Sequence, residues 1–133
     1  MKKGRRVVDE FLISLVEDDL SLQNALVRLV RSLGYSARGF SSAEEFLESD
    51  VLPTCACVIT DIQMPGMSGI DLSNRIAEQP SPIPVIMITA QGGTDLERSA
   101  LASGALCFLR KPIDTKRLID CIERALRLQP RTV

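Results

Sequence analysis

Apolar runs alternate along the chain with segments whose apolar residues recur at helical spacing. Residues 11–16 form a continuous apolar run that stops at three acids, as expected for a strand buried on both faces. After this run the period becomes helical, with apolar residues at Leu22, Leu26, Leu29, Val30 and Leu33. Gly34 follows as a C-terminal cap. The beginning of the chain therefore predicts one strand followed by one helix.

The same alternation continues to the end of the chain. Further strands are expected over residues 35–40, 57–61, 85–89 and 106–109, and further helices from Ser41 or Ser42 to residue 48, over 70–78 and 95–102, and from about 118 to 128. Five strands alternating with five helices predict an α/β fold, a doubly wound parallel sheet with helices on both faces. Ligands of such sheets bind at the carboxyl ends of the strands.

The composition is that of one ordinary globular domain. The chain has 133 residues, of which 45% are hydrophobic and 25% charged. We expect residues 1–10 to be an N-terminal extension, 11–128 the domain and 129–133 a tail. A formal net charge of -1 argues against direct nucleic-acid binding by this segment, and the basic stretch at residues 2–6 is interpreted as a solvated terminus. No apolar run is long enough to cross a membrane, so we expect a cytoplasmic protein without a membrane partner.

Histidine is absent from the sequence, and this narrows the possible chemistry. A Ser-His-Asp or Cys-His nucleophile, a histidine metal site and a phosphohistidine carrier are all excluded. The four cysteines do not form a zinc pattern, because Cys55 and Cys57 are expected on the same face of one strand with a single residue between them. We interpret them, with Cys107 and Cys121, as reduced core thiols. Any phosphoryl chemistry must use carboxylates.

Polar side chains follow four of the predicted strands where these end. Glu17 and Asp18 follow the first strand, Asp61 ends the third, Thr89 ends the fourth and Lys111 follows the fifth. Taken singly, each is more often a solvated acid, a helix cap, a strand end or an exposed lysine. Because the carboxyl ends of parallel strands lie at one edge of the sheet, the five are expected to converge on one crevice, which a solvated surface has no reason to arrange.

Crowded carboxylates repel one another unless a cation shares the site. Oxygen ligands without Cys or His suit Mg²⁺, with Mn²⁺ as an alternative, and we expect Asp18 and Asp61 to be direct ligands. A carboxylate beside both a metal and Lys111 is also a plausible covalent phosphoryl acceptor, and Thr89 is placed to donate a hydrogen bond to a phosphate oxygen. The sequence therefore predicts that Asp61 accepts a phosphoryl group.

Four ordered strings carry a family resemblance over residues 11–128: LVEDD, VITDIQMPGMSG, VIMITA and CFLRKP. They resemble the acidic pair, phosphoacceptor loop, hydroxyl strand and lysine-proline ending of the receiver domains of two-component response regulators. The resemblance implies a flavodoxin-like strand order 2-1-3-4-5. It also implies that Asp61 is phosphorylated by a sensor histidine kinase or a histidine phosphotransfer protein. Mg²⁺ would lie between Asp18, Asp61 and the backbone carbonyl of Gln63, with Glu17 acting through water.

The resemblance further implies a two-state switch. Thr89 would move toward the phosphoryl group, Lys111 would pair with it, Phe108 would rotate inward after Thr89, and the amides of Ile62 and Ala90 would complete the phosphate cradle. The last two helices and the last strand would then present the surface for a dimer or a downstream partner. By the same resemblance the protein is not an enzyme acting on other molecules, since it catalyses only its own phosphotransfer and slow autodephosphorylation. It is expected to be a stand-alone receiver or one excised from a helix-turn-helix transcriptional regulator.

Two departures from the family pattern and three rival functions accompany this interpretation. Many members have Asp in place of Glu17 and Tyr in place of Phe108, and both are common variants. A phosphatase of the haloacid dehalogenase type needs a second Asp where this chain has Gln63. A flavin mononucleotide site would have its phosphate repelled by the acids at residues 17–19. A degenerate receiver acting as a constitutive interaction module would normally have lost Asp61, Lys111 or the acidic pair.

Overall fold

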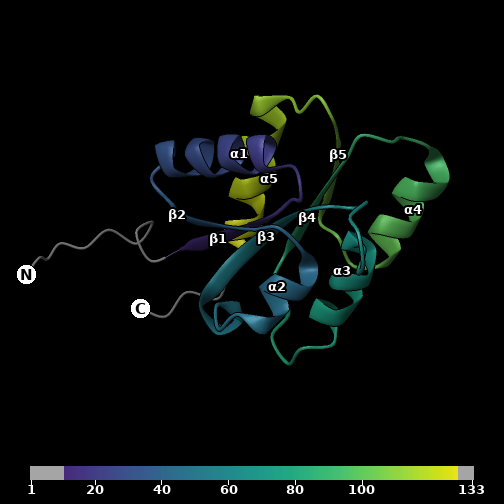
Figure 1. Ribbon diagram of the computed structural model, residues 1–133, viewed down its shortest axis with the longest axis horizontal. Coiled ribbons are helices and arrows are strands. Elements are labelled where there is room, and N and C mark those ends of the chain that lie inside the picture. The colour runs from purple at the N-terminus through teal and green to yellow at the C-terminus, as the bar shows by residue number, and fades with distance from the viewer. Residues whose placement is uncertain (1–10, 129–133) are drawn as a thin grey trace, which may run out of the picture.

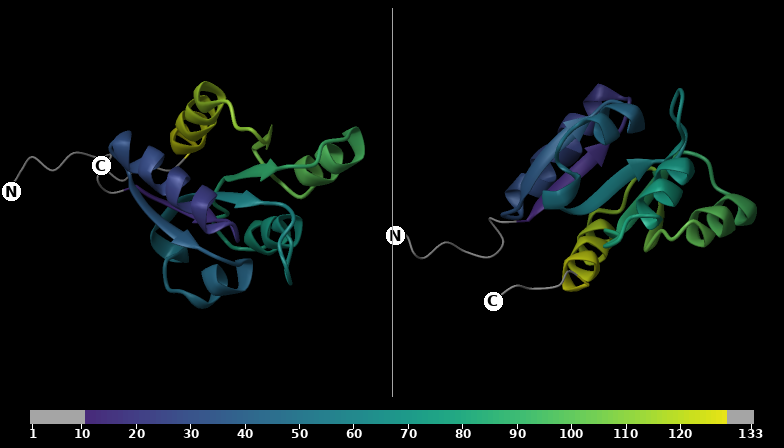
Figure 2. Two further views of the ribbon diagram at one scale, coloured as in Figure 1. Left: turned by 45° about the horizontal axis from the view of Figure 1, so that its top comes forward. Right: turned by 90° about the horizontal axis from the view of Figure 1, so that it is seen from below.

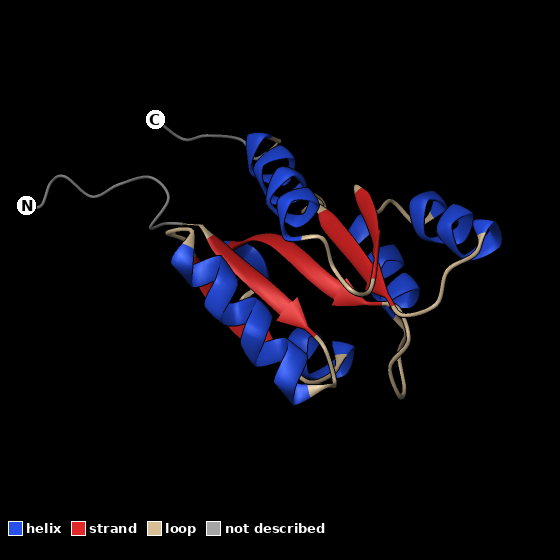
Figure 3. Cartoon of the chain, turned by 90° about the horizontal axis from the view of Figure 1, so that it is seen from above, coloured by secondary structure: helices blue, strands red, loops and turns tan. Residues whose placement is uncertain are grey.

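The computed structural model of the protein describes residues 11–128 and contains one five-stranded parallel sheet. Its strands lie in the order β2-β1-β3-β4-β5, which confirms the predicted fold class and strand order. The strands span Leu12–Val16 (β1), Ser36–Phe40 (β2), Cys55–Asp61 (β3), Val85–Thr89 (β4) and Cys107–Arg110 (β5). Figure 3 shows the sheet as a twisted central layer with helices around it. The point at which the strand order changes direction lies between β1 and β3. The acidic residues lie at the carboxyl ends of these two strands.

Helices cover both faces of the sheet (Figures 1 and 2). The helices are α1 (Leu20–Ser32), α2 (Ala43–Glu48), α3 (Gly69–Ala77), α4 (Thr94–Ala102) and α5 (Thr115–Arg127), with a 3-10 turn, η2, at Leu52–Thr54. α1 and α5 pack on one face, where Leu26, Val30 and Ile122 join a core with Ile13 of β1. α2, α3 and α4 enclose a second core on the other face. Both cores consist of apolar side chains removed from water, which is the main favourable contribution to folding.

Helix caps explain why several helices begin where they do. The carboxylate of Asp19 accepts hydrogen bonds from the amides of Ser21 and Leu22, so α1 begins at Leu20, two residues before the first apolar residue of the predicted pattern. Ser42 caps α2, because its side chain accepts a hydrogen bond from the amide of Glu45. Of the two predicted starts, Ser41 and Ser42, the second is therefore confirmed. These caps satisfy amides that the first helical turn leaves without partners.

The start of β3 corrects one expectation. Cys55 and Cys57 were expected on the same face, and this prediction was wrong: Cys55 packs with the core under α2 and α3, whereas Cys57 packs with the core under α1 and α5. The cause is a register shift in the pairing with β1, where Leu12 pairs with Cys55 but Ile13 pairs with Cys57. All four cysteines are buried and free.

The predicted N-terminal extension and C-terminal tail, including the basic stretch at residues 2–6, lie outside the described residues. Within residues 11–128, none of the helices combines the length and apolar character needed to cross a membrane.

Candidate functional site

Three carboxylates meet where β1 and β3 end. Glu17 and Asp18 directly follow β1, and Asp61 is the last residue of β3. One oxygen from each of the three lies within 4.8 Å of the other two. Glu17 and Asp61 are buried, with 1% and 6% of their surface exposed, whereas Asp18 is exposed. The parallel topology thus brings together the acids that the sequence predicted, and it leaves Asp18 on the side open to solvent.

Lys111 provides the positive charge of this cluster. Its Nζ lies 3.2 Å from Oε1 of Glu17 and 3.2 Å from Oδ2 of Asp61, to which it donates a hydrogen bond. The backbone holds Lys111 in place, because its amide donates to the carbonyl oxygen of Thr89 at 2.8 Å. The peptide bond to Pro112 is cis. One ammonium group therefore serves two buried carboxylates.

The burial and crowding of these groups change their proton affinities. Burial raises the pKa of Glu17, a hydrogen bond from the amide of Asp19 opposes this, and the nearby charge of Asp61 raises the pKa further. Lys111 lowers the pKa of Glu17 but does not cancel the rise. For Lys111 itself, burial lowers the pKa, but the two carboxylates more than compensate and the net shift is upward. The lysine therefore stays protonated at neutral pH.

The donor set fits a hard divalent cation. All the candidate ligands are oxygens, three carboxylates lie within reach of one ion, and a single lysine leaves the cluster with excess negative charge. Mg²⁺ prefers this kind of site, in which one or two carboxylates bind directly and water completes the coordination. Among the described residues, Oε1 of Glu17 is buried and is engaged by the Lys111 ammonium at 3.2 Å as an ion pair rather than by a well-aligned hydrogen bond.

Thr89 and Phe108 lie on the neighbouring strands β4 and β5 and have different surroundings. Thr89, at the end of β4, is fully buried, and its Oγ1 accepts a hydrogen bond from the amide of Gln91 at 3.1 Å. Phe108, in β5, is 9% exposed and packs in the core under α2, α3 and α4, beside Met87 in the strand register. In this structure the Thr89 hydroxyl is thus engaged by its own loop, and the Phe108 ring is already largely buried.

The backbone amides near Asp61 make hydrogen bonds within the protein. The amide of Ile62 donates to the carbonyl oxygen of Ile88 at 3.0 Å and so continues the sheet. The amide of Gln63 instead points at Asp61, 3.4 Å from Oδ1. Ala90 and the side chain of Gln63 are exposed. Of the two amides predicted for the phosphate cradle, that of Ile62 is thus engaged in the sheet, whereas the amide of Gln63 lies at the Asp61 carboxylate.

Three residues shape the loop after Asp61 in ways that the sequence did not predict. Glu44 of α2 accepts a hydrogen bond from the amide of Met67 at 2.8 Å, and Gly66, with φ +80°, leaves room for that carboxylate. At Gly69, a Cβ would collide with the carbonyl oxygen of Asp61 and lie 3.0 Å from Cα of Ile62. Glycine at position 69 thus lets α3 begin directly against the acceptor strand. The position of Gly69 directly before the helix expected over residues 70–78 was the sequence feature that could have indicated this close approach.

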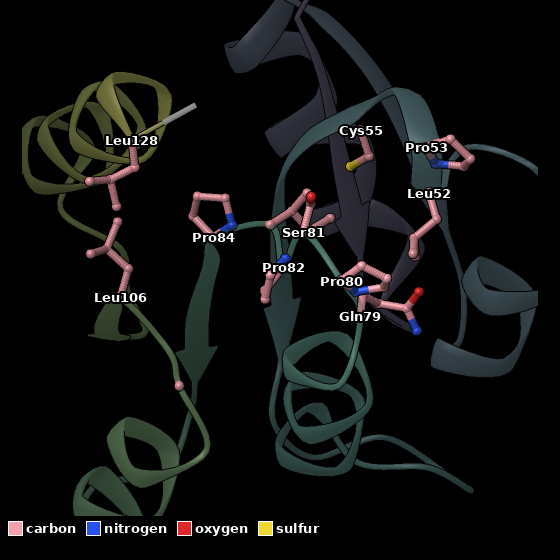
Figure 4. Close-up of a pocket in the computed structure, with 12 residues that line it drawn as sticks. Leu52, Pro53, Cys55, Gln79, Pro80, Ser81, Pro82, Pro84, Leu106 and Leu128 are labelled. Atoms are coloured by element: carbon pink, nitrogen blue, oxygen red, sulfur yellow. The ribbon is translucent and has the colours of Figure 1, made fainter. Parts of the chain in front are cut away.

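One large cavity of the described chain lies away from this cluster. It has a volume of 880 Å³ and is lined by Pro80, Pro82 and Pro84, which precede β4, together with Leu52 of η2 and Leu128 after α5 (Figure 4). These segments mark the amino ends of the strands, opposite the acidic edge. The acids and the lysine of the cluster do not line this cavity, whereas the thiol of Cys55 does.

A doubly wound parallel sheet of order 2-1-3-4-5 with three acids and a lysine at its carboxyl edge is the arrangement that the sequence predicted from its resemblance to receiver domains. The family model for the response regulator receiver domain matches residues 13–123 of the chain. The chain therefore belongs to the response regulator receiver domain family. Domains of this family are signalling domains of two-component systems.

Similar proteins agree with this assignment. The chain is 39% identical over 121 residues to the response regulator protein TmoT of Ectopseudomonas mendocina. This alignment covers 91% of the chain and 55% of TmoT. It is 38% identical over 117 residues to the transcriptional regulatory protein FixJ of Bradyrhizobium diazoefficiens, covering 86% of this chain and 56% of FixJ. The chain thus spans about half the length of these relatives.

Solved structures have the same fold. The crystal structure of FixJ-N has a TM-score of 0.82 and 28% identity, covering 93% of this chain and 99% of that one. The structure of response regulator StyR has a TM-score of 0.81 and 37% identity, covering 90% of this chain and 60% of that one.

Proposed function

We propose that this receiver accepts a phosphoryl group on Asp61 from a phosphohistidine of a sensor histidine kinase or a histidine phosphotransfer protein. The observation that carries the proposal is the shared position of Lys111, 3.2 Å from both Asp61 and Glu17, beside three clustered carboxylates. A solvated surface would not bury two acids beside a partly buried lysine, because unpaired buried charge is costly. The rival phosphatase and flavin functions gain no comparable support.

In the proposed reaction a carboxylate oxygen of Asp61 attacks phosphorus. A P–O bond forms as the P–N bond of the donor breaks, and the electron pair of that bond stays on the imidazole nitrogen. Lys111 holds its charge beside the transferring group, and its raised pKa keeps it protonated for this role. The amides of Gln63 and Ala90 are proposed to donate to the phosphoryl oxygens. The Ile62 amide can contribute only if its hydrogen bond to Ile88 opens.

We propose that Mg²⁺ is held by Asp18, Asp61 and the backbone carbonyl of Gln63, with Glu17 acting through water. When bound, the ion neutralises charge on the carboxylates and on the phosphoryl oxygens. The exposure of Asp18 leaves that side of the site open to water and to an incoming donor. Mn²⁺ has the same preference for oxygen ligands and is expected to substitute.

The donor needs an approach to Asp61, and an apolar groove borders the site. The groove has a volume of 440 Å³ and lies between α1 and the loop before α5, with Leu22, Leu29 and Ile113 in its lining and Lys111 at its edge. Lys111 thus belongs both to the groove and to the acidic cluster. We propose that an apolar helical face of the kinase or phosphotransfer protein packs here and brings its histidine to Asp61.

Phosphorylation is proposed to act as a switch through Thr89. Its hydroxyl would leave the Gln91 amide and donate to the phosphoryl group, and Phe108 would follow into the space vacated. α4, β5 and α5 would then present a changed surface to a second copy or a downstream partner. By analogy with the relatives of twice this length, we propose that residues 11–128 are the receiver of a transcriptional regulator.

The test uses a small phosphodonor in place of the kinase. Acetyl phosphate with Mg²⁺ is expected to add one phosphoryl group to the 133-residue chain, detected by intact mass, and chelation of the metal should abolish the addition. Asp61→Asn should not be labelled, whereas Asp71→Asn, an exposed acid in α3, should behave as the wild type. Equal labelling of Asp61→Asn would overturn the assignment.

A further inference from the structure

Gln23 is a polar residue on the core-facing side of α1. It is 8% exposed and lies one helical turn before Leu26, a member of the core. Its side-chain amide spans the ends of two strands: Nε2 donates to the carbonyl oxygen of Glu17 at 2.8 Å and to that of Phe40, the last residue of β2, at 3.0 Å. A buried polar side chain in such a place is expected to be hydrogen-bonded, and here its partner belongs to the acidic segment.

These hydrogen bonds form a closed frame around the residue that begins the acidic pair. The amide of Glu17 donates to the carbonyl of Phe40 at 2.9 Å, and Gln23 bonds to the carbonyl groups of both residues. On the side-chain end, Glu17 accepts from the amide of Asp19 at 3.1 Å. Glu17 is therefore held through its amide, its carbonyl and its carboxylate, and Asp18 is attached directly to that carbonyl.

The neighbouring strand leaves space for this frame. Gly39, in β2, lies under the side chain of Gln23: a Cβ at this position would collide with Oε1 and lie 2.7 Å from Cδ of Gln23. Alanine at position 39 would therefore push the amide away from the two carbonyl groups. The chain thus contains two independent positions, one on α1 and one on β2, through which the frame can be disturbed.

We infer that Gln23 is a positioning residue for the divalent-cation site, holding the Glu17 carbonyl so that Glu17 and Asp18 face Asp61. The inference rests on the proposed function, in which these carboxylates bind Mg²⁺. Without Gln23 the two carbonyl groups lose a shared donor, and the turn from Glu17 to Asp19 gains freedom. Groups that orient metal ligands from outside affect affinity by about tenfold or more, and we expect about tenfold weaker Mg²⁺ binding without the amide.

The experiment measures the Kd of Mg²⁺ alone by following backbone amide NMR signals of the full chain, that of Gln63 among them. Gln23→Ala is expected to weaken binding, whereas Asn24→Ala, which removes an exposed amide from the same helix, should retain the wild-type Kd. Ile122→Val, in the core under α5, controls for general destabilisation and should also leave the Kd unchanged. A wild-type Kd in Gln23→Ala would overturn the inference.

Gly39→Ala is a second way to disturb the hydrogen bonds of Gln23. It should weaken Mg²⁺ binding as Gln23→Ala does, and the double variant should bind no more weakly than Gln23→Ala alone, because both changes remove the same contact. Fully additive losses in the double variant would contradict the frame. Failure of the wild-type chain to bind Mg²⁺ would instead count against the proposed function, so the two failures are distinguishable.

Discussion

Glu17 and Lys111 form an ion pair at the carboxyl edge of the sheet, with 3.2 Å between Oε1 and Nζ. The pair joins the end of β1 to the end of β5, although about ninety residues separate them in sequence and β3 and β4 lie between these strands in the sheet. Because Lys111 lies equally close to Asp61, one lysine balances two buried carboxylates. Removal of any of the three charges therefore alters the balance for the other two.

Lys111→Met is predicted to destabilise the metal-free protein. The change leaves Glu17 and Asp61 facing each other without a cation, and a buried charged group that loses its partner costs about 1–3 kcal/mol. Chemical denaturation at neutral pH should detect the loss, and saturating Mg²⁺ should narrow the gap to the wild type. Lys116→Met, on the exposed first turn of α5, should have little effect. Equal stability of Lys111→Met and the wild type would contradict the pairing.

Glu17→Gln is predicted to stabilise the metal-free protein at pH 7. The pKa of Glu17 is raised above 4.5 by burial and by Asp61, so the folded state holds this proton more tightly than the unfolded state does. The contribution of Glu17 to stability therefore falls as the pH rises from 4.5 through the raised pKa. Gln carries no such charge, and its advantage over Glu17 should shrink as the pH is lowered toward 4.5.

Denaturation midpoints measured across this pH range test the sign. Glu123→Gln, an exposed glutamate of α5, is the control. A Glu17→Gln variant less stable than the wild type at pH 7 would show that the Lys111 ion pair outweighs burial.

Gly69→Ala is predicted to destabilise the protein and to disturb the acceptor strand. The added methyl group would collide with the carbonyl oxygen of Asp61, and neither backbone can yield easily, so a cost of about 1–3 kcal/mol is expected. In Gly92→Ala, by contrast, the methyl group meets only the tip of the exposed Arg110 side chain, 2.7 Å from Cζ. This control should change stability by less than about 0.5 kcal/mol. Thermal unfolding of the two variants gives the comparison.

Glu44→Ala is predicted to loosen the loop that follows Asp61. The carboxylate of Glu44 accepts from the amide of Met67 at 2.8 Å, and alanine leaves this amide without its acceptor. Hydrogen exchange at Met67 should accelerate, since local opening governs exchange at such a site. Glu48→Ala removes an exposed carboxylate from the same helix and should leave Met67 unchanged. Wild-type exchange in Glu44→Ala would contradict the contact.

The sequence predicted the sheet and the acidic edge because both follow from simple periodic rules. Continuous apolar runs such as residues 85–89 identify strands buried on both faces, and parallel topology then places their ends together. The residues 17, 18, 61 and 111 were predicted together and lie together. The grouping of these residues could be predicted because strands that are buried on both faces appear in the sequence as continuous apolar runs.

The missed features depend on contacts between elements. The register shift that separates Cys55 from Cys57 leaves no trace in the pattern of side chains, since both residues are equally apolar. The partner of the Ile62 amide depends on how far β4 runs beside β3. Gln23 had a visible signal, a polar residue on the apolar stripe of its helix, but its partners at residues 17 and 40 are set by tertiary packing. Such details need the assembled fold.

Chemical mapping of the acceptor tests the central claim most directly. The protein is phosphorylated with acetyl phosphate and Mg²⁺ and then reduced with borohydride, which converts an aspartyl phosphate to homoserine and leaves a free carboxylate unchanged. Peptide mass mapping should then find homoserine at position 61 and unmodified aspartate at positions 18 and 19. Homoserine at position 18, or none at 61 in protein whose intact mass shows a phosphoryl group, would contradict the assignment of Asp61 as the acceptor.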